Sequence, residues 1–543
     1  MGRHRTGYTP QARELNHNKV VEHQKLDRIR EILVPPGASS ARLYLSWLIF
    51  FGGLLALAAL LAPADIDQTM DERFGPFAKS ISDIVFFSLK INGAELPLIV
   101  LWLIVGAVFF TFYLRFINLR GFAHALRIVF GKVDAEEQAP GEVTHFQALA
   151  TAVSGTVGVG NIVHVAVAIS IGGPGATFWL ILAGFLGMAS KFVECTLGVA
   201  YRQENPDGSV SGGPMFYLHK GLAERGWPRL GKSLAWYYAV CIIGGTLGAS
   251  GMFQANQAYQ QFVSVTGGEG SFFSEHAWVF GALLAVIVGL VTVGGIRSIA
   301  RVTSRLVPAM ACLYLVMALI VIGANIDRLP WAIGSIVSNA FTPQAWTGGL
   351  IAVLILGFRR AAFSNEAGIG SASIAHSAVR TKEPLTQGFV AMLEPFIDTV
   401  VICTLTALTI IVTVYDPSGA TAGNMEGVEL TSRAVGSVVS WFPYLLAVVM
   451  ILFAFSTMIS WSYYGLEGCI YAFGPSPVIQ LIYNAVFGLF LVIGCTTDLK
   501  AVLDFSDAMI FAMALANILG LYILAPKVKG MLDAYWARVN TNE

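Results

Sequence analysis

Residues 146–170 read FQALATAVSGTVGVGNIVHVAVAIS, an apolar stretch with glycines and an asparagine at its centre. With its flanks it exceeds the length of about 20 residues that a membrane-spanning helix needs. Its middle, from Ser154 to Asn161, holds three glycines, and glycine favours unwinding of a helix. The stretch therefore predicts a helix that enters a membrane and is interrupted halfway.

A second interrupted stretch lies at residues 350–379, LIAVLILGFRRAAFSNEAGIGSASIAHSAV. Both stretches carry a GxG tripeptide, Gly158-Val159-Gly160 in the first and Gly368-Ile369-Gly370 in the second. Close helix packing would explain one such tripeptide. Two matched breaks with polar neighbours favour a binding site, because an ionisable group such as Glu366 is costly inside a membrane and usually functional. The polar neighbours in the second stretch are Ser364, Asn365, Glu366 and Ser371.

The composition is that of a membrane protein. Of 543 residues, 55% are hydrophobic and 13% charged, with a mean hydropathy of +0.66, whereas about a quarter of the residues in a soluble domain are charged. The apolar runs are continuous and lack the alternation of membrane-barrel strands, so the expected fold class is all-α and polytopic. A formal net charge of zero does not point to a nucleic-acid partner. The six cysteines are scattered without a CxxC pair, which argues against a disulfide framework or metal site.

The apolar runs divide into about twelve predicted spans. Residues 1–42 lack the early apolar core of a signal peptide, so we expect a cytoplasmic N-terminal tail. With this tail inside, most Lys and Arg fall in cytoplasmic loops or the cytoplasmic tail 526–543, as the positive-inside rule requires. The predicted spans lie near residues 43–62, 96–116, 146–170, 176–200, 234–262, 277–293, 305–324, 348–376, 387–414, 440–464, 476–495 and 505–525.

The spans suggest two related halves behind an N-terminal addition. Residues 43–145 form two extra helices and a connector, and the remaining ten helices divide into residues 146–324 and 325–525. Because each half has an odd number of helices, the second half has the opposite orientation in the membrane to the first. Such 5+5 inverted repeats are typical of secondary transporters, whose binding site lies at mid-membrane where the first helix of each half is broken.

The chemistry of a broken helix indicates which ligand to expect. Peptide groups without partners are tolerated in lipid only where they line a cavity. The N-terminal end of a half-helix offers N–H groups to a carboxylate, and exposed carbonyls suit a cation or an ammonium. The bare Cα atoms of Gly158 and Gly160 would let a carboxylate approach the amides of Val159 and Gly160. An amino acid with a sodium ion satisfies both kinds of group.

Four segments carry a family resemblance: SGTVGVGNIVHVAVAISIGGPGATFWLILAGFLGMASKFVECTLGVAYR from residue 154, SGGPMFYL from 211, GFRRAAFSNEAGIGSASIAHSA from 357 and FAFSTMISWSYYG from 453. They resemble the alanine or glycine:cation symporter family, over roughly residues 96–525. The resemblance implies a leucine-transporter-like fold and sodium-coupled symport of a small neutral amino acid by alternating access.

The resemblance also assigns roles to residues. Sodium would be held by the carbonyls of Ser154 and Val157 with Ser456 and Thr457, because adjacent hydroxyls suit a hard cation. A hydroxyl that bonds back to a carbonyl one turn earlier is the alternative for these two side chains. The implied substrate site comprises Thr156, Gly158, Val159, Gly160, Asn161, Gln254, Ile369 and Gly370.

Charged residues inside the spans form a further set. Lys191 with Glu194 and Glu394 with Asp398 lie in the second helix of each half. We expect Glu194, Asn365 and Glu366 to support the helix breaks, and Arg359 or Arg360 to act as a gate partner.

Two more features stand out in the spans. Gln254, Gln257 and Gln261 are spaced to share one helix face. His164 stands where the family has a small residue, and we interpret it, like His376, as structural in preference to a proton relay.

The sequence thus predicts a sodium-coupled amino-acid symporter. GxSxG, HExxH and GxxxxGK[ST] motifs are absent, so neither an enzyme nor an ATP-driven pump is expected. Proton coupling is the chief alternative, and an ion channel is a weaker one because two antiparallel breaks lack the symmetry of a channel filter. The expected partners are the amino acid and the lipid bilayer, with no nucleic acid and no obligatory protein. No cofactor is expected besides the coupling sodium ion, and the expected location is the inner (plasma) membrane.

Overall fold

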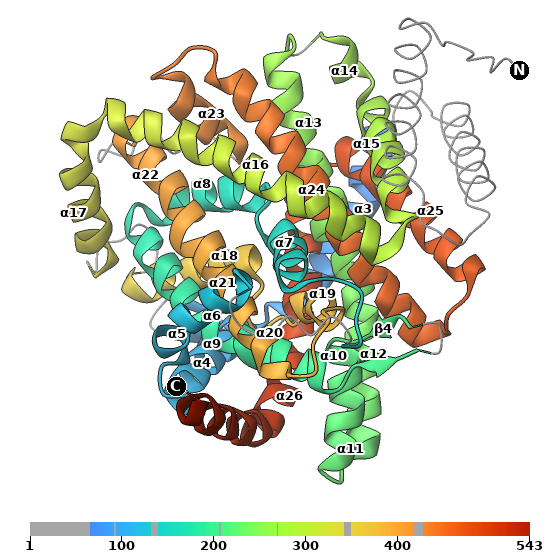
Figure 1. Cartoon of the computed structure of the whole chain (residues 1–543). Helices are drawn as coiled ribbons and strands as arrows, with labels where there is room; N and C mark the ends of the chain where they lie inside the picture. Colours follow the sequence, from blue (N-terminus) through green and yellow to red (C-terminus); the bar gives the residue numbers. More distant parts are fainter. Residues whose placement is uncertain are drawn as a thin grey trace, which may run out of the picture.

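The computed structural model describes residues 66–91, 94–131, 139–205, 208–268, 270–341, 349–415 and 427–542. The predicted span at 43–62 lies outside these residues. The described chain is a bundle of helices with two short hairpins (Figure 1). Seven described helices are long and apolar enough to cross a membrane, or eight if the bent pair α7 and α8 counts as one span. The all-α membrane fold is therefore confirmed, whereas the count of twelve and the inverted repeat stay predictions.

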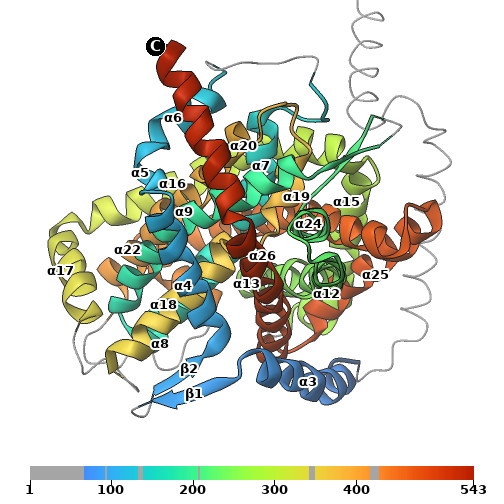
Figure 2. The same cartoon turned by 90° about the horizontal axis from the view of Figure 1, so that it is seen from below.

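Among the described residues before position 145, the sequence analysis did not predict the helix α3 or the short helices α5 and α6. Helix α3 is amphipathic and packs against α26, and it lies beside the β1–β2 hairpin at one end of the bundle (Figure 2). The predicted span at 96–116 is present as α4. The elements are α3 (Ile66–Val85), β1 (Ser88–Ile91), β2 (Ala94–Pro97), α4 (Leu98–Tyr113), α5 (Ile117–Arg120) and α6 (Phe122–Val129).

The elements of residues 139–341 follow the predicted spans closely. The expected break in the first helix separates α7 from α8, and the predicted span at 234–262 is one continuous run, Pro228–Val265, with the π-helical turn η2 in its middle. The helices are α7 (His145–Thr156), α8 (Gly160–Gly172), α9 (Gly175–Ala200), α10 (Pro214–Phe216), η1 (Tyr217–Gly221), α11 (Leu222–Glu224), α12 (Pro228–Gly245), η2 (Thr246–Met252), α13 (Phe253–Val265), α14 (Phe272–Glu275), α15 (Ala277–Thr292), α16 (Gly295–Ala324), η3 (Ile326–Arg328) and α17 (Leu329–Ala340). Two short strands, β3 (Gln203–Glu204) and β4 (Val210–Ser211), form the second hairpin.

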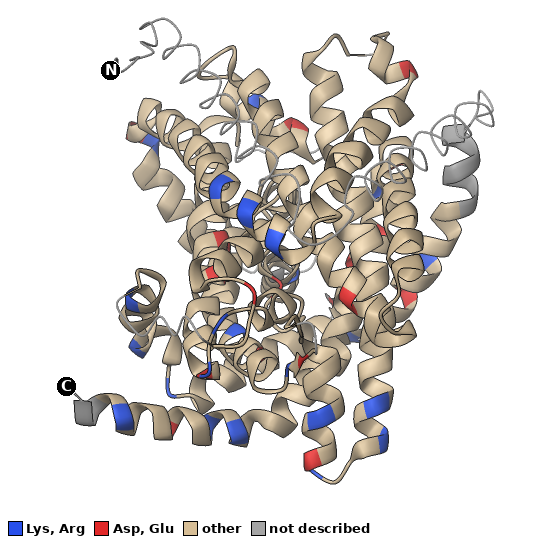
Figure 3. Cartoon of the chain, turned by 45° about the vertical axis from the view of Figure 1, so that its right-hand side comes forward, with Lys and Arg blue, Asp and Glu red and all other residues tan. Residues whose placement is uncertain are grey.

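The second half opens with the other expected break, between α18 and α19. Its last helix, α26, continues through the predicted C-terminal tail, and Figure 3 shows this part lying across one end of the bundle. The elements are α18 (Gly349–Asn365), α19 (Ala372–Ser377), α20 (Pro384–Ala391), α21 (Leu393–Pro395), η4 (Phe396–Cys403), α22 (Thr404–Thr413), α23 (Val428–Gly436), α24 (Phe442–Phe473), α25 (Pro477–Thr496) and α26 (Leu499–Asn542).

Aromatic side chains hold the end of α26 in place. Tyr535 hydrogen-bonds to His124 of α6 at 2.7 Å, and Phe389 of α20 packs against the rings of both Tyr535 and Trp536. The predicted tail is therefore helical and packs against α6 and α20.

The two broken helices meet at the centre of the bundle. Helix α18 packs against α8, α19 packs against α7, and α24 contacts both α7 and α19. Both interruptions therefore face the same interior space, which the labelled helices in Figure 1 surround.

Close packing of η2 against α25 gives a test of the bundle. A Cβ atom at Gly494 would lie 2.4 Å from the Cα atom of Met252. Since backbone cannot yield there, Gly494→Ala should destabilise the fold by about 1–3 kcal/mol. This will be measured as a lower thermal unfolding midpoint in detergent.

Gly334→Ala is the matched control, because a Cβ atom at Gly334 meets nothing within 4 Å. Its midpoint should stay the same or rise, since Ala is a better helix former. Equal midpoints for both variants would contradict the proposed packing.

Candidate functional site

The first break presents two peptide amides to side-chain oxygens. Helix α7 ends at Thr156, α8 begins at Gly160, and the two are bent by 41°. The Gly158 N–H donates to Asn161 Oδ1 at 2.8 Å, and the Val159 N–H donates to Gln254 Oε1 at 3.1 Å. Two of the amides exposed by the break are therefore satisfied by side-chain amide oxygens.

Glycine is required at position 158 because other groups approach its Cα closely. A Cβ atom there would lie 2.5 Å from Thr457 Oγ1 and 3.2 Å from Gln254 Oε1. The first contact is too short for a side chain unless the Thr457 hydroxyl turns away or α24 moves. Gly158 thus lets α24 and α13 close onto the break.

The second break is held in backbone conformations that L-residues rarely adopt. Between α18 and α19, Glu366 has φ +57°, Gly368 +88° and Gly370 +93°. A glutamate in this region is uncommon. Its carboxylate accepts hydrogen bonds from Trp461 Nε1 at 3.0 Å and from the Ser371 hydroxyl, which fix the turn. The role of Glu366 as a support of the break stays a prediction.

A small closed cavity lies between the two breaks. Of the residues assigned to the substrate, Thr156, Gly160 and Gln254 line it, and so do Thr457 and Glu366. The other lining residues are Gly155, Ala249, Phe363, Ser364, Trp461 and Ile510. The sequence analysis did not predict Phe363 and Trp461 as site residues. Both lie beside polar residues in two of the segments that carry the family resemblance, and this proximity could have indicated them.

Two residues assigned to the substrate point elsewhere. Ile369 is fully buried and does not line the cavity. A Cβ atom at Gly370 would lie 2.7 Å from Pro214 and 2.9 Å from Asn517, away from the cavity. Both residues belong to the turn between α18 and α19 and not to its cavity wall.

Asn161 connects the breaks and does not line the cavity. Its amide Nδ2 donates to Asp398 Oδ1 at 2.5 Å and to Ser364 Oγ at 3.1 Å. The Ser364 hydroxyl in turn donates to Asp398 Oδ2 at 2.8 Å. Asn365 donates through Nδ2 to Thr399 Oγ1 at 2.9 Å. Asp398 and Thr399 on η4 therefore tie α8 to α18.

The predicted sodium ligands come together where α24 crosses the end of α7. Thr457 Oγ1 donates to the Ser154 carbonyl at 3.1 Å, and Ser154 Oγ donates to the Ser456 carbonyl at 2.7 Å. The Ser456 hydroxyl donates to Phe453 O at 2.9 Å within its own helix, and its oxygen lone pairs can still accept. Val157 has ψ +94°, which turns its carbonyl out of the helical direction. Such oxygen-rich surroundings suit a hard cation.

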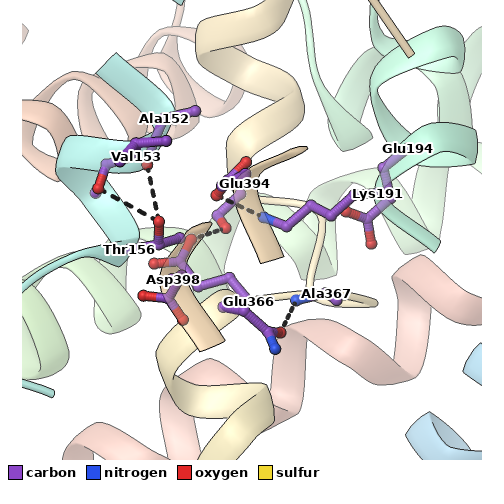
Figure 4. A network of polar contacts seen from close by, with 12 residues as sticks. Ala152, Val153, Thr156, Lys191, Glu194, Glu366, Ala367, Glu394 and Asp398 are labelled. Carbon is purple, nitrogen blue, oxygen red and sulfur yellow. Dashed lines mark hydrogen bonds and ion pairs between the residues drawn. The ribbon is translucent and has the colours of Figure 1, made fainter. Parts of the chain in front are cut away.

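Buried charged residues on α9 and α21 lie close to the two breaks (Figure 4). Lys191 Nζ on α9 lies 3.0 Å from Glu394 Oε1, and both side chains are fully buried. Asn517 Nδ2 donates to Glu194 Oε1 and to the Gly368 carbonyl, each at 2.9 Å. Asn517 thus connects Glu194 to the second break, and the role of Glu194 as a support stays a prediction.

Arg359 and Arg360 form a second charged group with α26. Asp507 Oδ2 accepts from Arg359 at 2.7 Å and lies 3.4 Å from Arg360 Nη1. Arg360 Nη1 also donates to His164 Nδ1 at 2.7 Å, so that ring nitrogen carries no proton. The guanidinium of Arg359 lies 3.9 Å from the ring centre of Phe86. Both arginines therefore pair within the protein.

The Lys191–Glu394 pair gives a test of the buried charges. Lys191→Met should destabilise the protein by about 3–5 kcal/mol, because it leaves Glu394 charged and buried without its partner. The double variant with Glu394→Gln should recover part of this loss. Thermal unfolding midpoints in detergent will measure both effects.

The exposed pair of Lys90 and Glu95, at 3.5 Å, supplies the control. Lys90→Met should leave the midpoint unchanged, because water screens that pair. A Lys191→Met midpoint equal to that of Lys90→Met would show that the buried pair is not needed for the fold.

Comparison with known proteins places these features in one family. A model of the sodium:alanine symporter family matches residues 83–543. The sodium/alanine symporter AgcS of Methanococcus maripaludis is 35% identical over 441 residues, which cover 81% of this chain and 94% of AgcS. A Bacillus subtilis protein, named as the probable sodium/glutamine symporter GlnT, is 33% identical over 440 residues, covering 81% of this chain and 87% of GlnT.

A solved structure supports the fold. The crystal structure of MhsT in complex with L-phenylalanine aligns with a TM-score of 0.52 and 16% identity, covering 71% of this chain and 89% of MhsT. The leucine-transporter-like fold implied by the sequence is thereby confirmed. The chain belongs to the sodium:alanine symporter family, whose members are membrane proteins that couple amino-acid symport to a cation.

Proposed function

We propose that this protein is a sodium-coupled symporter of small neutral amino acids, such as alanine or glycine, that works by alternating access. The observation that carries the proposal is the contact between Val159 N–H and Gln254 Oε1 at 3.1 Å, because Gln254 lines the cavity between the two broken helices. This amide is the donor that a substrate carboxylate needs, and a side-chain oxygen occupies it in the structure.

In this proposal the substrate carboxylate replaces Gln254 Oε1 on the Val159 amide. The side chain of Gln254, which lines the cavity, can then turn its Nε2 group toward the carboxylate. The carboxylate of Glu366 lines the same cavity and places negative charge where an ammonium group would lie. The apolar side chains of Phe363, Trp461 and Ile510 line the same cavity and would limit the size of the substrate side chain, which favours alanine or glycine over larger amino acids.

Sodium binding is proposed at the crossing of α7 and α24. The ion would be held by the carbonyls of Ser154, Val157 and Ser456 and by Thr457 Oγ1. Thr457 also lies against Gly158. The coupling ion and the substrate-binding break therefore share one helix end, which gives a physical reason for the two to bind together.

The two breaks support the proposal of alternating access. Each broken helix has two segments that can tilt separately about an unwound joint. The proposed location is the inner (plasma) membrane with both termini in the cytoplasm, because most Lys and Arg then lie on the cytoplasmic side. Basic residues on α12 and on the end of α26 lie at the same end of the bundle (Figure 3).

Replacement of sodium by choline tests the coupling ion. Proteoliposomes with an inward sodium gradient should accumulate radiolabelled L-alanine, and the accumulation should be lost in choline at the same pH. A panel of unlabelled amino acids competing for this uptake will define the preferred substrate.

Proton coupling is the alternative favoured by one observation, the burial of Glu394 and His376 beside Lys191. Uptake that persists in choline and follows an imposed pH gradient would replace sodium by protons in the proposal.

Thr457→Ala tests the proposed sodium ligands. Loss of the hydroxyl should raise the sodium concentration for half-maximal uptake by about tenfold, equivalent to roughly 1.4 kcal/mol. At saturating sodium the KM for L-alanine should change little. Thr457→Ser keeps the oxygen and is the control. An unchanged sodium dependence in Thr457→Ala would exclude this residue as a ligand.

A further inference from the structure

A buried group of polar and charged side chains lies one helical turn from the central cavity. Each member belongs to a helix that also contributes a residue to the cavity wall. In the predicted topology each member lies on the outer side of that wall residue, so the group lies between the cavity and the outside. The members are His164 on α8, Arg360 on α18 and Asp507 on α26, which lie three or four residues from Gly160, Phe363 and Ile510.

The imidazole ring of His164 packs directly on the cavity wall. Its Cδ2 atom is 3.4 Å from the position of a Cβ atom at Gly160. Its ring centre lies 4.1 Å from that of Phe363 and 4.9 Å from that of Phe253. The residue is 1% exposed. Because Gly160 and Phe363 both line the cavity, the position of this ring is linked to closure of the cavity on its outer side.

A hydrogen bond fixes the protonation of this ring. Arg360 Nη1 donates to His164 Nδ1 at 2.7 Å. A guanidinium can only donate, so Nδ1 accepts and the one proton of the neutral ring is on Nε2. Nε2 is buried and has no hydrogen-bond partner among the described residues. The contact with Arg360 can therefore form only while the ring is neutral.

A second proton on the ring would add a positive charge to a group that already has one in excess. Arg359 and Arg360 share a single carboxylate, that of Asp507, at 2.7 and 3.4 Å. A protonated Nδ1 would face the Arg360 donor as a second donor. Arg360 is 8% and Asp507 1% exposed, so water cannot screen the repulsion. A buried charge needs a partner, and the protonated ring is therefore compatible only with a group that has opened to water.

The charges that act on the ring are those of Arg359, Arg360 and Asp507. Phe253 on α13, which also packs on the ring, is uncharged. Charged side chains on the other helices in contact with α8 belong to other groups. They are Asp398 on η4, bonded to Asn161 and Ser364, Lys191 on α9, paired with Glu394, Glu194 on α9, bonded to Asn517, and Glu429 and Arg433 on α23, which line a separate pocket. Asp504 on α26 interacts with Arg359 and Asp507.

We propose that His164 is a positioning residue whose neutral ring holds the cavity closed toward the outside, and that a proton taken up from the outside favours the open state. The proton binds when the group separates and leaves again to the same side when the group closes, so no proton crosses the membrane. Acid outside should therefore weaken closure over the substrate. This inference rests on the proposed function, because it takes closure to follow binding of the amino acid.

Binding of tritiated L-alanine to the purified full-length protein in sodium-containing detergent buffer tests the proposal. Histidine in water has a pKa of about 6.5. At about pH 5.5, roughly ten of every eleven open molecules would carry the proton, so the apparent Kd should be about tenfold higher than at about pH 8. Equal Kd values at the two pH values would overturn the inference.

A variant assigns the pH dependence to the ring. His164→Asn keeps an oxygen that can accept from Arg360, but this oxygen does not titrate, so the Kd of the variant should be the same at both pH values. The control is His276→Asn, in the loop between α14 and α15 on the predicted outer side, which should keep the tenfold change. A tenfold change that persists in His164→Asn would overturn the inference.

Proton release can be measured on the wild-type protein and does not depend on the folding of a variant. Addition of L-alanine in weakly buffered solution near pH 6.5 should release up to about half a proton per chain, because closure expels the proton from the open molecules that carry it. At about pH 8 the release should be close to zero. Proton uptake near pH 6.5, or equal release at both pH values, would overturn the inference.

The two proposals fail in distinguishable ways. Absence of sodium-dependent binding of L-alanine at about pH 8 would refute the proposed function. Sodium-dependent binding whose pH dependence is absent, or persists in His164→Asn, would refute only the role of His164.

Discussion

The whole structure depends on how peptide groups are satisfied where two helices stop in the middle of a membrane. Lipid offers no hydrogen bonds, so each unwound segment needs partners from its neighbours. At the first break the partners are Asn161 and Gln254, and at the second they are Asn517 and the side chains around Glu366. The bundle is arranged so that these polar groups converge, and the cavity is the space they enclose.

The all-α membrane fold could be predicted from the sequence because its helices and breaks correspond to long, contiguous stretches of residues. Apolar runs located the helices, and clustered glycines located both breaks. The amphipathic α3 was missed because half of its residues are polar, which hides it from a search for apolar runs. The continuation of α26 was missed because its stability comes from contacts with α6 and α20, which are far away in the sequence.

The site could be predicted only where the residue type itself carries the chemistry. Gln254 and Thr457 were assigned by the family resemblance and Glu366 as an ionisable group inside an apolar helix, and all three line the cavity. Phe363 and Ile510 were not assigned, since apolar side chains look alike along a membrane helix. The spacing of residues in the sequence also does not predict which way a side chain points. Asn161 and Gly370 belong to the breaks, but they face neighbouring helices and do not line the cavity.

The Val159 donor is a main-chain group, and Gly158 beside it has no room for a side chain. At position 159 only proline would remove the amide N–H, because every other residue keeps it, so this donor is shielded from most substitutions. Diversification among relatives is then confined to the apolar wall around Ala249, Phe363 and Ile510. In the proposed function, the contact between the main chain and the substrate carboxylate can stay the same while the accepted substrate side chain differs from one transporter to the next.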